Sequence, residues 1–293
     1  MIAGPDLVRR NVLWLVVCTA IWGLGFVATA RTLASMHPLW SNAVRFLIAA
    51  PVGLLVFRRK LVVDRAHLIA AGTASVFLTA AFAFQTWGLR YTSVGRSSLI
   101  TGLYAVFTPL CAPLFRAPPP RVMHFVGAVV AFAGLSVLGG AWQEGDAGLN
   151  LGDALTLGCA LVSVGHIYVV AKVAPGRDPF ALNALQVSFC ALWSLILALL
   201  FGGPPPTSMD TETLVAMSFL AVFSSVVAFG IQMMAQQVLS ASTAATLLLM
   251  EAPFGVLFGV LLLSETLAIP QLLGGALMLG GCILSVRADA DRN

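Results

Sequence analysis

A single carboxylate interrupts one of the most apolar stretches of this chain. Glu251 lies in TLLLMEAPFGVLFGVLLL, residues 246–263, which contains no other charged residue. A carboxylate at the centre of a membrane span is costly, so it normally faces protein or a water-filled cavity. We therefore expect Glu251 to line a cavity, where it binds a cationic or amino group or carries a proton. The alternative is a hydrogen bond that only joins neighbouring helices.

A second polar face is expected on the segment that contains Tyr104. Four hydroxyl side chains follow one another there at spacings of four, three and four residues: Ser97, Thr101, Tyr104 and Thr108. This spacing places them on one face of a helix, and we expect that face to look into the cavity. His166 is the other titratable residue well inside an apolar segment, and imidazole changes charge at about pH 6 to 7. It is a second candidate for proton coupling, with a packing hydrogen bond as the alternative.

Four further residues are candidates for the cavity or its surroundings. The indole of Trp22 can stack against an aromatic or cationic solute, and plain packing is the alternative. Gln85 and Gln232 occupy equivalent positions of an internal repeat, which favours a shared role at the gates, although packing hydrogen bonds explain them nearly as well. Arg45 lies about 10 Å into its segment at 1.5 Å per residue, and we expect a structural partner for its charge.

The composition identifies the chain as an integral membrane protein. Of its 293 residues 59% are hydrophobic and only 10% are charged, against roughly 25% charged in a soluble domain, and the mean hydropathy is +0.95. Apolar segments long enough to cross a hydrocarbon core of ~30 Å recur from end to end. Ten transmembrane helices are predicted, at 12–32, 38–57, 66–88, 94–115, 122–141, 152–172, 179–201, 213–236, 241–263 and 268–286.

No metal, cofactor or nucleic-acid site is predicted. The five cysteines all lie in apolar segments without a CxxC pair, which indicates packing roles. The net charge of +4 comes from arginines and lysines that are explained by membrane topology. The sequence contains no HExxH motif, no paired catalytic carboxylates and no plausible Ser/His/Asp set, so we expect no enzyme activity.

The two halves of the chain repeat each other. A shift of 147 residues aligns 81–137 with 228–284 without a gap, and a shift of 141 aligns the earlier parts of the halves. The predicted units are 1–143 and 148–293, with five spans each. Because five is odd, the two units must cross the bilayer in opposite directions. Inverted repeats of this kind are typical of transporters that work by alternating access, with the site near the midplane where the halves meet.

The repeat also gives Glu251 a partner. Tyr104 and Glu251 are equivalent at the shift of 147, and each lies about 15 Å inside its predicted span at 1.5 Å per residue. Pro109 and Pro113 interrupt the span of Tyr104, and Pro253 interrupts the span of Glu251. Matched proline-broken helices in the two halves are the best sequence indication of a transport site.

Five motifs occur in order along the chain. They are AIWGLGFV at 20–27, HPLWSNAVRF at 37–46, GLRYTSVGRSSLITGLYAVF at 88–107, SASTAATLLLMEAPF at 240–254 and LLLSETLAIPQLLGGALMLGG at 261–281. In these motifs the chain resembles the EamA-type members of the drug/metabolite transporter superfamily. The resemblance implies two inverted five-helix repeats and the efflux of small metabolites or drugs, with amino acids prominent among them. Two positions depart from the family pattern, because Ala252 separates Glu251 from Pro253 and Ala105 stands where a proline is common.

These observations predict a secondary-active transporter that exports small metabolites, with amino acids, including aromatic ones, as the first candidates. The alternatives are an efflux pump for cationic drugs and, from another class, a channel or membrane receptor. A midplane carboxylate near Tyr104, Trp22 and Tyr168 suits a zwitterionic or cationic solute with an apolar body. Nucleotide sugars and sugar phosphates fit poorly, because their anionic groups would require an Arg or Lys at the midplane and none is expected there.

We expect the chain to work as a monomer in the bacterial inner membrane, with both termini in the cytoplasm. In this orientation twelve Lys and Arg residues lie in inside segments and only three in outside loops. Such an asymmetry is the usual mark of cytoplasmic loops.

The predicted topology places the loop at 141–150 outside the cytoplasm. In a variant without the native cysteines, Gly145→Cys should react with an impermeant thiol reagent added to intact cells, whereas Arg59→Cys should react only after the membrane is opened. Labelling of the Gly145→Cys variant from the cytoplasmic side alone would show that the charge count has been assigned to the wrong loops.

Overall fold

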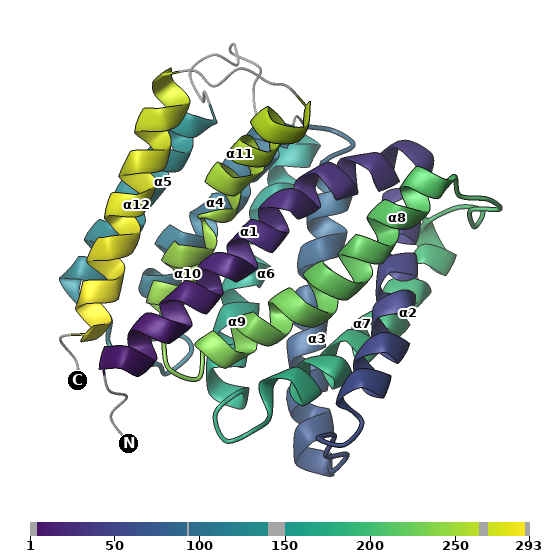
Figure 1. The fold of residues 1–293 in the computed structure, drawn as a ribbon, viewed down its shortest axis with the longest axis horizontal. Coiled ribbons are helices and arrows are strands. Elements are labelled where there is room, and N and C mark those ends of the chain that lie inside the picture. Colours follow the sequence, from purple (N-terminus) through teal and green to yellow (C-terminus); the bar gives the residue numbers. More distant parts are fainter. Residues whose placement is uncertain (1–4, 93, 140–149, 264–268, 291–293) are drawn as a thin grey trace.

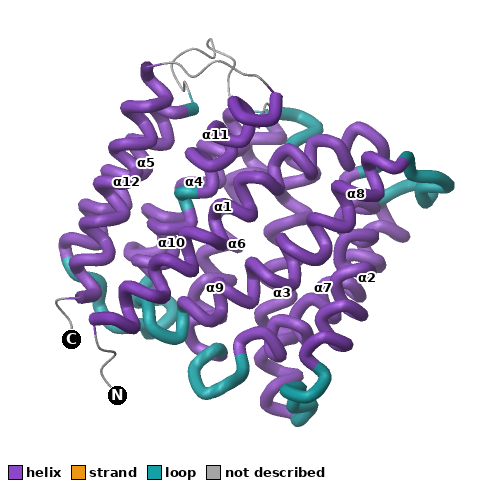
Figure 2. The backbone as a smooth tube through the Cα atoms, viewed as in Figure 1, coloured by secondary structure: helices purple, strands orange, loops and turns teal. Residues whose placement is uncertain are grey.

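The structure, a computed structural model, describes residues 5–92, 94–139, 150–263 and 269–290, and the regular structure within these ranges is helical (Figure 2). In chain order the elements are α1 (Pro5–Ser35), α2 (Pro38–Phe57), α3 (Arg65–Gly88), α4 (Val94–Cys111), α5 (Val122–Leu138), α6 (Leu151–Val173), α7 (Pro179–Phe201), α8 (Thr211–Phe219), the π-helix η1 (Leu220–Ala228), α9 (Phe229–Ala235), α10 (Ala241–Leu248), α11 (Glu251–Leu263) and α12 (Ile269–Ala290).

The described elements form the ten spans that the apolar pattern predicts, which confirms the all-helical membrane fold. α8, η1 and α9 follow one another without a break and make one span, and α10 and α11 make another. Eight spans are long and apolar enough to cross a bilayer, whereas α4 and α5 are shorter apolar helices. α4 ends at Cys111 rather than at 115. Pro113 explains the difference, because helices usually end at or before the residue that precedes a proline.

Equivalent spans of the two halves pack against each other at both edges of the bundle. Figure 1 shows α5 beside α12 at one edge and α2 beside α7 at the other. Between these pairs, α1 packs along α11 and α8, while α6 packs along α3 and α4. The fifth spans therefore face each other, as do the second spans, and the first span of each half packs against helices of the other half.

Both chain ends lie at the same end of the bundle (Figure 1). We call this end the termini side and the opposite end the far side. On the far side, Arg31 at the end of α1 pairs with Asp210, the N-cap of α8, at 2.6 Å. The N–H of Thr213 and the charge of Arg31 hold the pKa of Asp210 below its ordinary value. On the termini side, Lys60 pairs with Asp178, the N-cap of α7, at 3.0 Å.

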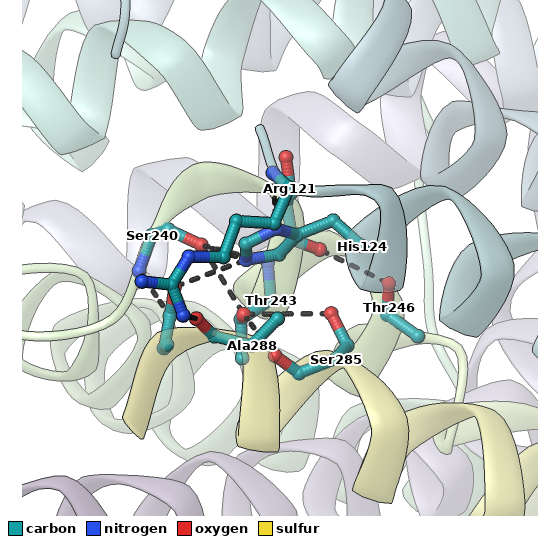
Figure 3. Close-up of polar contacts among 9 residues, drawn as sticks. Arg121, His124, Ser240, Thr243, Thr246, Ser285 and Ala288 are labelled. Carbon is teal, nitrogen blue, oxygen red and sulfur yellow. Dashed lines mark hydrogen bonds and ion pairs between the residues drawn. The ribbon is translucent and has the colours of Figure 1, made fainter. Parts of the chain in front are cut away.

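A buried polar cluster joins α5, α10 and α12 on the termini side (Figure 3). The Nδ1 of His124 accepts a hydrogen bond from the N–H of Arg121, so its Nε2 carries the hydrogen and donates to Asp289 at 3.1 Å. The other oxygen of Asp289 accepts the N–H of Ser240 at 2.9 Å, and the guanidinium of Arg121 donates to the carbonyl of Ala288 at 3.2 Å. These contacts fix the start of α10 against both edge helices.

The seam between α5 and α12 depends on glycines at repeat-equivalent positions. A Cβ atom at Gly274 would lie 2.6 Å from the backbone N of Leu138 and 2.7 Å from the carbonyl oxygen of Gly134. Such distances are too short for a side chain, so the two backbones touch, as small residues allow in membrane helices. Gly275, one position further along α12, faces open space.

This seam gives a matched pair of variants. Gly274→Ala should destabilise the protein by roughly 1–3 kcal/mol, as overpacking does in a close-packed core. Gly275→Ala, which adds the same methyl group and the same helix propensity, should leave stability unchanged or raise it slightly. Thermal unfolding in detergent compares the two, and equal transition temperatures would show that the α5–α12 seam can open without cost.

Candidate functional site

A cavity lies in the middle of the bundle, between the two halves of the chain. Its volume of about 160 Å³ is roughly ten times what a single water needs. Its walls come from α1, α2, α3, α4, α6, η1, α9, α10 and α11, and the lining residues are Trp22, Gly25, Phe26, Thr29, Arg45, Leu78, Ala81, Phe82, Gln85, Tyr104, Cys159, Ser163, His166, Ile167, Leu220, Ser224, Phe229, Gln232, Leu248 and Glu251.

Many of the lining residues are repeat equivalents of one another. At the shift of 141 the pairs on the wall are Trp22/Ser163, Gly25/His166 and Phe26/Ile167. At the shift of 147 they are Phe82/Phe229, Gln85/Gln232 and Tyr104/Glu251. The two halves therefore contribute the same positions to one cavity. A pseudo-two-fold axis between them follows from this pairing.

Glu251 stands at a break in its span. α10 ends at Leu248 and α11 begins at Glu251. Pro253 accounts for the break, because its ring clashes with the carbonyl of Leu249 and it has no N–H to offer that carbonyl. The break turns the first residue of α11 toward the cavity. Within the described part of the chain the Glu251 carboxylate has no hydrogen bond and no ion pair, so the contacts supply no helix-joining bond for it.

The helix face of Tyr104 is divided between cavity and packing. Tyr104 lines the cavity, and Ser97 lines an adjoining one while its hydroxyl lies 3.3 Å from that of Thr156 on α6. Thr101 and Thr108 are buried away from the cavity wall, and Thr108 donates to the carbonyl of Tyr104 at 2.7 Å. The packing of α4 on α6 buries this side of the face, so the uniform polar lining expected from the spacing is not present.

The prolines of the first half act differently from the one beside Glu251. Pro109 lies inside α4, near its end. Pro113 lies beyond α4 and ends the helix rather than interrupting it. The two halves therefore do not carry matched breaks in this structure, since only the second half has its break next to the cavity residue.

His166 is held in a chain of amide side chains. Its Nε2 lies 3.2 Å from Oε1 of Gln186, and Gln186 donates to Oδ1 of Asn183 at 3.3 Å. Asn183 in turn donates to the carbonyls of Ser225 and Val226 in η1, both at 2.9 Å. The imidazole therefore lines the cavity in a fixed orientation, tied to the π-helix through Gln186 and Asn183 of α7.

Trp22 and the two glutamines take different positions on the wall. The Nε1 of Trp22 donates to the carbonyl of Ser224 at 3.1 Å, and its ring lies 4.8 Å from that of Phe229. Gln232 donates to Gln236 at 3.0 Å, but its buried Oε1 has no hydrogen-bond partner among the described residues. The amide of Gln85 is only partly buried and likewise faces the cavity.

Arg45 corrects the expectation that the site contains no cation. Its guanidinium lines the cavity, where Nε donates to the hydroxyl of Ser225 at 2.7 Å and a terminal nitrogen donates to that of Ser224 at 2.8 Å. The sequence pattern indicates that Arg45 lies well inside its span, but it does not indicate that α2 turns this residue toward the cavity. Ser163 and Cys159 were also missed, although Ser163 is the repeat equivalent of Trp22.

The cavity continues toward the far side. A second cavity of about 70 Å³ shares Thr29, Arg45 and Gln85 with it and reaches Ser41 and Asn42 at the start of α2. A third, of about 500 Å³, follows at the loop between α1 and α2. The three cavities therefore follow one another from the centre of the bundle to its far side.

The termini side of the cavity is closed by direct contacts. The hydroxyl of Tyr168 on α6 donates to the carbonyl of Thr108 at 2.6 Å, and its ring stacks on Phe115 at 4.6 Å. Gln236 donates to the carbonyl of Ile167 at 2.9 Å. α4, α6 and α9 are therefore joined between the central cavity and a separate cavity of about 270 Å³ on the termini side, whose lining includes Tyr168 and Gln236.

Comparisons with known proteins agree with this architecture. A model of the EamA-like transporter family matches residues 9–140 and again 150–287. An uncharacterized transporter of Archaeoglobus fulgidus is 32% identical over 274 residues, which are 93% of this chain and 84% of that protein. A probable amino-acid metabolite efflux pump of Escherichia coli is 24% identical over 294 residues, with 95% of each chain covered.

A solved crystal structure shares the fold, with a TM-score of 0.79 at 19% identity over 94% of this chain and 98% of that one. The family model covers nearly the whole chain in two copies, and the copies correspond to the two halves that meet at the cavity. The chain is a multi-pass membrane transporter and belongs to the EamA-like transporter family.

Proposed function

We propose that this transporter exports amino acids by alternating access, with the central cavity as the solute site. The observation that carries the proposal is the unpaired carboxylate of Glu251 on a cavity wall between the two halves. A carboxylate inside a membrane protein needs a partner or water. An ammonium group of a transported solute is a partner that arrives with the solute and leaves with it.

The remaining walls suit the rest of an amino acid. Trp22, Phe82 and Phe229 surround the cavity with aromatic rings, which favour apolar and aromatic side chains. Relatives from Escherichia coli and Salmonella typhimurium are named probable amino-acid metabolite efflux pumps, at 24% and 25% identity, and support the same class of solute. An efflux pump for cationic drugs is less well supported, because Arg45 repels a cation that carries no carboxylate.

We propose that the far side is extracytoplasmic and that both termini lie in the cytoplasm, as the excess of Lys and Arg in the corresponding loops favours. In this orientation the row of three cavities leads outward. Rocking of one half against the other closes this row and separates Tyr168 from Thr108 on the termini side. One chain supplies both halves of the cavity, so we propose that the monomer is the working unit, in a bacterial inner membrane.

Glu251 is the proposed site of proton coupling, with His166 as the second candidate. A carboxylate that alternates between an ammonium partner and a proton remains neutralised in every step, which removes the cost of a bare charge in the membrane. His166 donates from Nε2 to Oε1 of Gln186, so its Nδ1 could take up a proton without breaking this bond.

Transport in proteoliposomes tests the proposed function. The wild type should move labelled amino acids, and cationic dyes poorly, at a rate that changes with the imposed pH gradient. Glu251→Gln should remove the pH dependence while solute exchange at equal pH survives, because the amide keeps the shape of the side chain and cannot carry a proton. The measurement is counterflow of labelled amino acid at two pH values.

The other outcomes assign Glu251 differently. Loss of exchange as well, in a protein that still purifies as a folded species, means that Glu251 binds the solute without coupling it to protons. No change in either measurement means that Glu251 only packs in the bundle. If dyes but no amino acids are moved by the wild type, the proposal of amino-acid export is wrong.

Access of thiol reagents to the cavity tests the alternating movement. Leu248 lines the cavity next to the break at Glu251. In a variant without the native cysteines, Leu248→Cys should react with impermeant reagents from either side of the membrane, and bound solute should slow both reactions by roughly tenfold. Leu279→Cys, on the exposed face of α12, should react from neither side. Reaction of the Leu248→Cys variant from one side only, under every gradient, contradicts a cavity that alternates.

A further inference from the structure

Arg45 is a buried cation that has no counter-ion among the residues that the structure describes. Its side chain is 6% exposed, and it lies inside α2 on the cavity wall. Among the described residues it forms no ion pair, and its hydrogen-bond partners are the neutral hydroxyls of Ser224 and Ser225. Charged residues inside membrane spans are rare and normally pair with each other or mark a solute pathway. The charge of Arg45 therefore needs an explanation beyond packing.

The guanidinium has donors to spare and a fixed orientation. It carries five N–H groups, and the two serine contacts use only part of them. The ring of Phe82 lies 4.5 Å from Cζ and covers one face of the guanidinium. The serines are held in turn, because Ser225 donates to the carbonyl of Leu220 at 2.9 Å inside η1. The group is thus positioned in advance, with its free donors available to an anion from the cavity.

The repeat shows that the fold does not need a charge at this position. Gln186 is equivalent to Arg45 at the shift of 141, and it is fully buried on α7, away from the cavity wall. Its neutral amide satisfies the packing role by bonding to His166 and Asn183. The equivalent helix α7 is therefore built with an amide at this position, and a positive charge is present only in the copy that reaches the cavity.

We propose that Arg45 binds the carboxylate of the transported solute, and so distinguishes amino acids from amines that lack this group. The proposal rests on the proposed function and assigns the anionic end of the solute. The planar guanidinium offers parallel N–H groups that match a carboxylate in bidentate geometry. The ammonium end is then left to Glu251 and to the unpaired Oε1 of Gln232 on the second half.

Ligand pairs that differ only in the carboxylate test this assignment. Binding of phenylalanine and of phenethylamine to the purified protein in detergent is measured by quenching of tryptophan fluorescence, independently of transport. The wild type should bind the amino acid more tightly than the amine. Arg45→Gln should weaken binding of the amino acid by roughly 30-fold or more, as expected for the loss of one partner of a buried hydrogen-bonded charge pair. It should change the affinity for the amine by less than about threefold.

Two further variants separate recognition from folding. Arg45→Lys keeps the charge without the bidentate geometry, so compared with the wild type it should bind the amino acid more weakly and the amine equally well. This comparison holds even if Arg45→Gln fails to fold. Ser225→Ala removes one contact that orients the guanidinium. It should weaken binding of the amino acid by a few-fold and leave binding of the amine unchanged.

The results decide the assignment in either direction. Two results would show that Arg45 has a structural role only and would overturn the proposal. One is an equal loss of affinity for the amino acid and the amine in Arg45→Lys, and the other is tighter binding of the amine than of the amino acid by the wild type. Selective loss of the amino acid supports it, and does so even if proteoliposomes show no net export, in which case the proposed function is wrong and the carboxylate site stands.

Discussion

The constraint on which this structure depends is that a polar group inside the bilayer must find a partner within the protein or face water. The described side chains meet it in two ways. Amides and hydroxyls bond within the protein: Asn183 donates to the carbonyl of Ser225 on the next span of the same half, and the hydroxyl of Ser225 donates to the carbonyl of Leu220 within η1. Charged groups are treated differently, because Arg45 and Glu251 both lie on the wall of the central cavity and form no ion pair with a described residue. The packing of the bundle is thereby separated from the chemistry of its site.

The π-helix η1 serves both purposes. A π-helix is rare and is frequent at functional sites, and here it spans nine residues in the middle of the eighth span. Its carbonyls accept the amide of Asn183 on one side and the indole of Trp22 on the other, while the hydroxyls of Ser224 and Ser225 hold Arg45. Through these contacts η1 connects the edge pair of α2 and α7 to the cavity.

The sequence was sufficient to predict the spans, their number and the repeat, because hydrophobic length and an ungapped shift depend on local patterns. It also indicated Glu251 and Tyr104, since a carboxylate in an apolar run is conspicuous and the shift supplies the partner. It could not predict which polar face packs and which faces the cavity. Thr101 lies on the expected face but is covered by α6, and Arg45 turns to the wall, since both outcomes depend on helix rotation set by tertiary packing. Nothing in the residues of η1 marks a π-helix.

Symmetry of position and asymmetry of chemistry together make such a fold suitable for a transporter. Movement between two states requires halves that can exchange roles, and the paired lining residues Phe82 and Phe229 are identical in the two copies. A solute with distinct ends requires the opposite. At the positions where the copies differ most in chemistry, an acid stands in place of Tyr104 and an amide in place of Arg45. The aromatic pair can therefore keep the apolar surface constant while the halves rock. The charged positions, each present in one half only, allow the cavity to distinguish the two ends of the solute.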